Sequence, residues 1–250
     1  MRLNFTIVSS VLLLACWTCA GECRGQDLSV SVHVVITEAE GANGKTATGK
    51  LPDAANVAVW LVPLDGSDAN GVHHFFLDKQ PQLVQRHKTF EPHVLIVPVG
   101  TRVEFPNKDP FFHNIFSLYD GRRFDLGLYE GGTTRSVLFD RAGVSFLFCN
   151  IHAEMSAVVV SVSTPYYGLS DHSGNVVIRD VPNGRYQMSV WYERASTEYL
   201  KGLTRTVTIS DSGRSLGVLR IRENPKFTPA HKNKYGLEYV PPPNTEYEQP

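Results

Sequence analysis

The chain has 250 residues, of which 42% are hydrophobic and 20% are charged, and its formal net charge is −1. This composition is typical of a folded globular protein of one large or two small domains, and it excludes wholesale disorder. The near-zero net charge gives no electrostatic reason to expect a nucleic acid or an anionic membrane surface as a partner.

The first 25 residues have the features of a secretory signal peptide. Arg2 supplies a positive start, and residues 5–15 form an apolar run shorter than the about 20 residues that span a membrane. We therefore expect an exported protein, periplasmic or on the outer surface, with no transmembrane span in the mature chain. Cleavage after Ala20 fits a signal peptide, whereas residues 13–16 resemble a lipoprotein box, so a lipid anchor stays open as an alternative.

Two segments far apart in the chain predict strands of a small β-sandwich. Apolar and polar residues alternate over residues 28–36, which is a strand signal. The other strands predicted in these segments are residues 57–62, 175–178, 186–192, 204–209 and 215–221. The two N-terminal strands alone bury too little apolar surface to be stable. We therefore expect residues 27–65 and 165–222 to form one discontinuous sandwich, with a simple linear order of two domains as the alternative.

The intervening residues 83–163 contain strands separated by Gly, Pro, Asn and Asp turns, at the spacing of a sandwich or barrel. The predicted strands are residues 94–99, 101–105, 113–118, 133–139, 145–148 and 157–162. Because no window shows a helical period, the predicted fold class is all-β, with this domain inserted into the sandwich. Residues 224–250 are rich in Pro and Tyr, and we expect an irregular tail there that lies along the body.

Cysteine, histidine and methionine follow one another at intervals of three in a loop between two predicted strands, as Cys149, His152 and Met155. A second histidine, His113, lies upstream after a turn at residues 106–110. A thiolate, two imidazoles and a weak thioether form the ligand set of an electron-transferring type 1 copper site. These four residues are therefore predicted to hold one mononuclear copper ion.

The other three cysteines, at positions 16, 19 and 23, lie in or beside the leader, so Cys149 stands alone in the body of the chain. A buried structural cysteine, a zinc ligand and a catalytic nucleophile are the competing interpretations. Zinc would favour a cysteine, histidine or carboxylate in place of Met155. For a catalytic nucleophile at Cys149, the sequence shows no accompanying oxyanion-hole motif.

The C-x-x-H-x-x-M loop and residues 92–162 resemble the cupredoxins, with a loop of the amicyanin type and similarity to cupredoxin-like proteins of methylamine utilisation. The resemblance implies a Greek-key barrel, one copper ion and electron transfer to a redox partner protein that the sequence does not identify. It also implies that the side chain of Asn114 ties the strand of His113 to the cysteine loop. Separately, residues 51–60 and 166–192 resemble a carboxypeptidase regulatory-like sandwich of the transthyretin type.

The sequence predicts a single-electron carrier and no catalytic residue, so we do not expect an enzyme. A copper oxidase or reductase would need a further copper site, usually with His-x-His pairs, and the chain has none. A copper-binding structural or partner-binding protein is the alternative function. A second metal at His73, His74 or His87 stays open. Of Phe111 and Phe112, we expect one to be exposed beside the copper, because strand neighbours face opposite sides.

Overall fold

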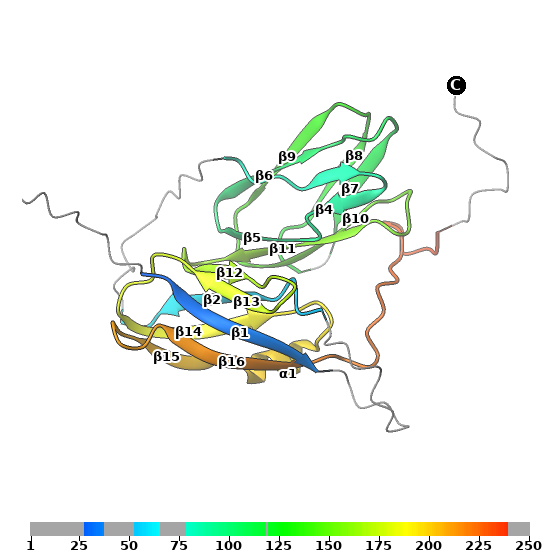
Figure 1. The fold of residues 1–250 in the computed structure, drawn as a ribbon. Coiled ribbons are helices and arrows are strands. Elements are labelled where there is room, and N and C mark those ends of the chain that lie inside the picture. Colours follow the sequence, from blue (N-terminus) through cyan, green and yellow to red (C-terminus); the bar gives the residue numbers. More distant parts are fainter. Residues whose placement is uncertain (1–27, 38–52, 66–78, 119, 240–250) are drawn as a thin grey trace, which may run out of the picture.

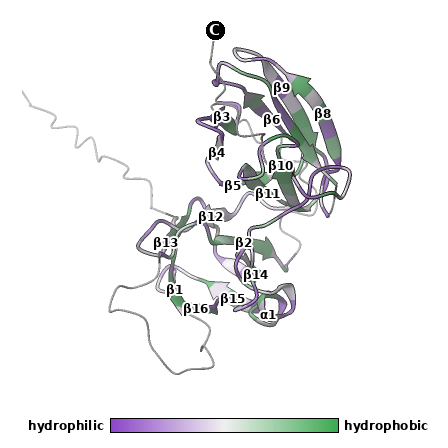
Figure 2. Ribbon diagram, turned by 90° about the vertical axis from the view of Figure 1, so that its right-hand side faces the viewer, coloured by the Kyte–Doolittle hydropathy of each residue, from purple (hydrophilic) through white to green (hydrophobic). Residues whose placement is uncertain are grey.

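The computed structural model describes residues 28–37, 53–65, 79–118 and 120–239. In these ranges the chain forms strands and one short helix, which confirms the all-β prediction. The strands make two units that lie one above the other (Figures 1 and 2). We call the unit of β1, β2 and β12 to β16 the terminal sandwich, and the unit of β3 to β11 the central sandwich.

The terminal sandwich combines strands from both ends of the chain. One sheet has the order β13-β1-β16 and the other the order β12-β2-β14-β15. The strands are β1 (Val30–Thr37), β2 (Ala58–Pro63), β12 (Tyr167–Leu169), β13 (Asn175–Ile178), β14 (Gly184–Trp191), β15 (Arg205–Ile209) and β16 (Ser215–Arg222). Buried and more exposed residues alternate along β1, so one face of its sheet covers the core. The segments before residue 66 and after residue 165 thus share both sheets, with the central sandwich between them in sequence.

The central sandwich consists of a five-stranded sheet, in the order β5-β11-β10-β7-β8, and two strand pairs, β6-β9 and β3-β4. Its strands are β3 (Val84–Arg86), β4 (Thr89–Glu91), β5 (Val94–Pro98), β6 (Thr101–Pro106), β7 (His113–Ser117), β8 (Phe124–Tyr129), β9 (Thr134–Phe139), β10 (Gly143–Phe148) and β11 (Ser156–Val162). They enclose an apolar core that contains Cys149 and Met155. The loop from β10 to β11 lies at the sheet end where the antiparallel β7 begins.

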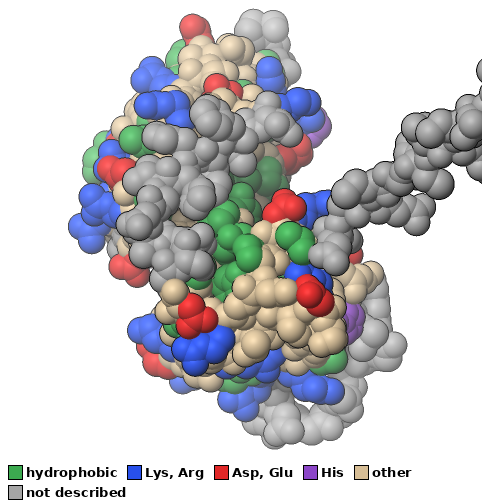
Figure 3. Space-filling model, turned by 90° about the vertical axis from the view of Figure 1, so that its left-hand side faces the viewer, with side chains coloured by type: hydrophobic (Ala, Val, Ile, Leu, Met, Phe, Trp, Pro, Cys, Tyr) green, Lys and Arg blue, Asp and Glu red, His purple; other side chains and the backbone are tan. Residues whose placement is uncertain are grey.

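The two sandwiches meet through an apolar junction. On β11, Ala157 and Val159 face the core of the central sandwich, whereas Val158, Val160 and Val162 belong to a separate cluster with residues of the terminal sandwich. Trp191 of β14 packs there against Phe146 of β10, with ring centroids 6.3 Å apart. Figure 3 shows hydrophobic side chains gathered along this junction. A strand buried on both faces is continuously apolar, and this explains the sequence of β11.

Several elements were not predicted from the sequence: strands β3, β4, β8 and β12, and helix α1 (Thr197–Gly202). The prediction of no helix was wrong at α1, where the Ser196 side chain accepts a hydrogen bond from the backbone N–H of Tyr199. This helix has six residues, too few for a period to show, but a serine cap was its local signal.

Other predictions lie outside the described residues, namely the leader, its cleavage positions, His73 and His74, and residues 240–250. No helix in the described ranges has the length and hydropathy needed to cross a membrane. Residues 224–239 form no regular element, and this segment leaves β16 and runs beside the central sandwich (Figure 1, orange to red).

Candidate metal centre

Three of the four predicted ligands converge at one end of the central sandwich. The Sγ of Cys149 lies 3.9 Å from Nδ1 of His113 and 3.6 Å from Nδ1 of His152, and the two Nδ1 atoms are 3.1 Å apart. His113 is the first residue of β7, and Cys149 directly follows β10, so neighbouring strands present both side chains at the same sheet end. In the described part of the chain, these side chains are the one group of three that could hold a metal ion.

Met155, the fourth predicted ligand, is fully buried in the same apolar cluster as Cys149. The loop between them closes on itself, because the Cys149 N–H donates to the Met155 carbonyl and the Met155 N–H to the His152 carbonyl, both at 3.2 Å. Cysteine and methionine are therefore held side by side at the two ends of a tight loop.

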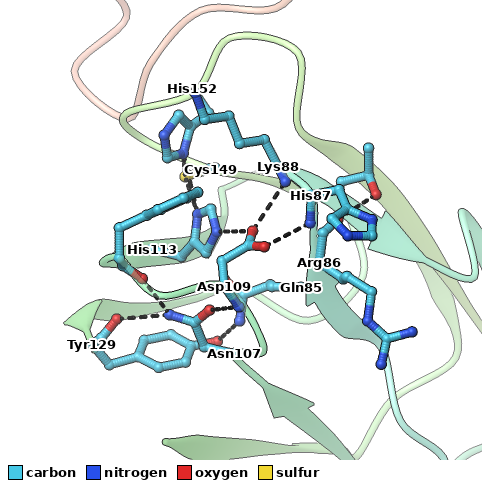
Figure 4. A network of polar contacts seen from close by, with 12 residues as sticks. Gln85, Arg86, His87, Lys88, Asn107, Asp109, His113, Tyr129, Cys149 and His152 are labelled. Carbon is cyan, nitrogen blue, oxygen red and sulfur yellow. Dashed lines mark hydrogen bonds and ion pairs between the residues drawn. The ribbon is translucent and has the colours of Figure 1, made fainter. Parts of the chain in front are cut away.

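A carboxylate that the sequence analysis missed fixes the orientation of His113. Asp109 accepts a hydrogen bond from Nε2 of His113 at 2.7 Å, and both side chains are buried (Figure 4). The same carboxylate accepts the backbone N–H groups of His87 and Lys88, at 2.6 and 3.0 Å. Because Nε2 carries the proton, the lone pair of Nδ1 faces Cys149 and is available to a metal.

The turn that carries Asp109 is itself held by buried polar groups. Asn107 accepts the Asp109 N–H and donates to the carbonyl groups of Phe111 and Tyr129 (Figure 4). Gln85 of β3 donates to the Tyr129 hydroxyl, which in turn donates to the backbone of β6. The positions of His113 and Asp109 are thus set by packed strands instead of by a mobile loop.

The electrostatics of the site depend on burial and on backbone N–H groups. Burial raises the pKa of the Cys149 thiol, although the N–H groups of Asn114, Ile151 and His152 that point at the sulfur act in the opposite direction. Burial and the neighbouring His113 lower the pKa of His152. For Asp109, burial is outweighed by hydrogen bonds from Lys88, His113 and His87, so the pKa of its carboxyl lies below the ordinary value. A lowered pKa favours the neutral imidazole of His152, which is the form that binds a cation.

Asn114 contacts the site differently from the predicted arrangement. Its side chain donates to Asp125 of β8 at 2.8 Å, and its side-chain oxygen is buried without a hydrogen-bond partner. Its backbone N–H, not its side chain, points at the Cys149 sulfur. The strand of His113 is therefore joined to the cysteine loop through the backbone.

The surroundings of the two imidazoles differ. His113 is fully buried, whereas His152 is partly exposed. Phe111 is half-buried, with its ring 5.2 Å from that of His113 and 5.7 Å from that of His152, and Phe112 is 54% exposed. His87 is exposed, and it contributes its backbone N–H to the Asp109 network.

The donor atoms fit copper. Two imidazole nitrogens and one thiolate sulfur, with a thioether in the same loop, form the soft and borderline donor set that copper prefers and that structural zinc sites rarely use. The apolar walls also suit a type 1 site, because they restrict access of water to the metal.

Solved structures similar to part of the chain include cupredoxins, at low overall similarity. A purple cupredoxin from Nitrosopumilus maritimus is 24% identical over 33% of this chain and 99% of its own, with a TM-score of 0.31. A reduced amicyanin variant is 21% identical over 34% of this chain and 85% of its own, with a TM-score of 0.32. A copper-containing nitrite reductase from Thermus scotoductus is 21% identical over 53% of this chain and 28% of its own, with a TM-score of 0.33. No protein-family model and no curated protein matches the chain.

Proposed function

We propose that this protein is an exported type 1 copper protein that transfers single electrons. The observation that carries the proposal is the convergence of His113 Nδ1, Cys149 Sγ and His152 Nδ1, with Met155 buried in the same loop. Copper bound there would alternate between two oxidation states that differ by one electron. The residues of the chain supply a fixed set of donors, so little reorganisation accompanies the change.

The exposed side of the site supports a route for the electron. His152 is the partly exposed ligand, and apolar residues beside it reach the surface: Ile151, its neighbour in the loop, is 46% exposed, and Phe111, whose ring lies 5.7 Å from its own, is half-buried. Exposed apolar residues beside a ligand favour close approach of a partner, with the exposed Glu154 and Lys88 near His152 as polar neighbours of that contact. We therefore propose that a redox partner protein docks over His152, and that His113, which is fully buried, holds the metal from the inner side.

Copper loading of the purified full-length chain tests the proposal. We expect an intense thiolate-to-copper band in the visible spectrum, which a one-electron reductant removes and a one-electron oxidant restores. Cys149→Ser and His152→Gln should each abolish this band. The control His172→Gln changes a histidine of the terminal sandwich whose side chain is 87% exposed, and it should keep the band.

The copper-loading result also distinguishes an electron carrier from a protein that uses copper only for structure. Copper that binds at the predicted ligands without reversible reduction would contradict electron transfer and favour a structural role for the metal. A band that persists in Cys149→Ser would overturn the ligand assignment itself.

A further inference from the structure

The chain that follows β16, a strand of the terminal sandwich, contacts a loop of the central sandwich. We call that loop, residues 149–155 with three of the candidate ligands, the metal-binding loop. The chain after β16 begins on the terminal sandwich, where the Asn224 N–H donates to the Arg194 carbonyl at 2.7 Å. It then passes to the central sandwich and reaches the end of β10 (Figure 1). We call residues 231–239 the clamp segment.

The clamp segment binds three consecutive residues at the start of the loop. The ring of His231 stacks on Phe148, with centroids 4.1 Å apart and an interplanar angle of 22°. The Tyr239 hydroxyl donates to the Cys149 carbonyl at 2.6 Å, and the Lys234 N–H donates to Oδ1 of Asn150 at 3.0 Å. Stacking and two hydrogen bonds thus act on the residues that set the position of the cysteine.

The same segment is tied to the strand that carries His113. Lys234 Nζ lies 2.8 Å from Asp125, and the other oxygen of that carboxylate accepts the side chain of Asn114 at 2.8 Å. The clamp segment therefore links the cysteine loop, through Lys234 and Asp125, to the residue next to the second ligand. Through this link it restrains both strands that supply ligands.

We propose that the clamp segment holds the metal-binding loop in its ligand-ready geometry, and that Tyr239 is its central positioning residue. The proposal rests on the proposed function for the meaning of the loop, but the contacts belong to the metal-free chain. Cys149 is fully buried, so its carbonyl loses hydration on folding and needs a donor inside the protein. Tyr239 provides that donor from a segment 90 residues further along the chain.

The chemistry of Tyr239 suits a permanent donor. A tyrosine hydroxyl keeps its proton at neutral pH, so it can always donate to the Cys149 carbonyl. The edge of its ring lies against His231, with centroids 5.3 Å apart, and this contact fixes the hydroxyl in direction. A loop held in its bound shape before the metal arrives loses less conformational entropy on binding.

Tyr239→Phe in the full-length, metal-free chain tests this role, because it removes the hydroxyl and keeps the ring. Cys149 is alkylated with iodoacetamide, and its labelling is followed by peptide mass spectrometry, which separates it from the other cysteines. We expect its labelling rate to rise roughly tenfold, the change in a local opening equilibrium that loss of one buried hydrogen bond brings. Amide exchange should rise in the peptide that spans residues 149–155.

The matched control is Tyr186→Phe, which makes the same change at a tyrosine of the terminal sandwich, where the hydroxyl donates to the Pro182 carbonyl at 2.9 Å. In this control variant, the labelling rate of Cys149 should equal that in the unmodified chain. The midpoint of thermal unfolding should fall by a few degrees in both variants, because each loses one hydrogen bond of the folded state. Faster labelling in Tyr239→Phe alone therefore reports the loop and not a general loss of stability. A Tyr239→Phe chain whose Cys149 is labelled no faster than in the control would overturn the proposal.

The assay contains no copper, so its outcome is independent of whether the loop binds that metal. Copper-loaded Tyr239→Phe provides a second readout, and it should lose copper to a chelator faster than Tyr186→Phe. Faster labelling without any copper binding would support the clamp and contradict the proposed function. Equal labelling of Cys149 in Tyr239→Phe and its control, together with a normal copper band, would contradict the clamp and support the proposed function.

Discussion

At the scale of single residues, His113 uses its two ring nitrogens for different purposes. Nε2 donates to Asp109, and Nδ1 points to Cys149. A carboxylate that holds a histidine in this way fixes the tautomer and makes the other nitrogen a better electron donor. Asp109 also carries the charge nearest to the inner side of the site, so it should influence both metal affinity and reduction potential.

Asp109→Asn should weaken copper binding by about 10- to 100-fold, the usual effect of removing such a partner of a metal-ligating histidine. The reduction potential should rise, because a negative charge near the site favours the more positive oxidation state of copper. Competition with a chelator measures the affinity, and voltammetry measures the potential. Asp140→Asn is the control, since Asp140 pairs with Arg122 at the surface of the same sandwich. Equal affinities in the two variants would show that Asp109 has no role in binding.

The candidate ligands could be read from spacing, whereas their supports could not. Cys149, His152 and Met155 lie in one short loop, so local sequence contains their relation. Asp109 stands in a turn where an aspartate is common for reasons of backbone geometry alone. Its role depends on the hairpin of β3 and β4, whose backbone N–H groups meet its carboxylate only after long-range packing. The bond from Tyr239 to Cys149 crosses 90 positions and has no local signal.

At the scale of elements, the strands that were predicted have long apolar or alternating runs, and those that were missed are mostly short. β3 and β4 have three residues each, and they are joined through His87 and Lys88, whose φ angles are 53° and 55°. A tight turn with two left-handed residues usually contains Asn or Gly. Here the Asp109 carboxylate binds both N–H groups and stabilises the turn. A tertiary contact thus replaces the local signal.

A histidine just before β5 connects the two sandwiches. His93 Nε2 lies 2.7 Å from Glu193, which follows β14, and Nδ1 lies 3.1 Å from the Ser156 carbonyl. Two acceptors favour the doubly protonated ring, and the hydrogen bond to Glu193 is the main cause that raises the pKa of His93. The ring is 38% exposed, so solvent screening limits the pair to at most about 1 kcal/mol.

This pair should stabilise the fold only at acidic to neutral pH. Because the pKa of His93 is raised on folding, its contribution is complete below the ordinary histidine value and is lost as the pH rises through the raised value. Glu193→Gln should therefore lower the free energy of unfolding by up to about 1 kcal/mol at about pH 5.5, and by much less at about pH 8.5. Denaturant unfolding at both pH values measures the difference. Glu91→Gln, at the exposed pair with Arg86 whose charge is the same at both pH values, should show no such dependence. A pH-independent effect of Glu193→Gln would contradict the assignment.

At the scale of the whole molecule, the junction should make the two sandwiches unfold together. Its central residues, Ala58, Val94 and Val158, are at most 1% exposed. Separating the sandwiches would expose this apolar surface to water, and that cost opposes independent unfolding. The chain after β16 adds a second connection, since it contacts the terminal sandwich at Asn224 and reaches the metal-binding loop of the central sandwich through the clamp segment. The position of the loop thus depends on both units remaining docked.

Val158→Asp should uncouple them. The substitution buries an unpaired carboxylate at the junction, which costs about 3–5 kcal/mol, and undocking relieves that cost by exposing the charge. Calorimetry should show one unfolding transition for the unmodified chain and two for the variant. Alkylation of Cys149 should also be faster, because undocking moves Asn224, from which the chain runs to the clamp segment, away from the central sandwich. Val177→Asp is the matched control, at a β13 position that is 51% exposed, and it should keep one transition. A single, unshifted transition in Val158→Asp would mean that the junction does not couple the sandwiches, and the loop would then owe its geometry to the central sandwich alone.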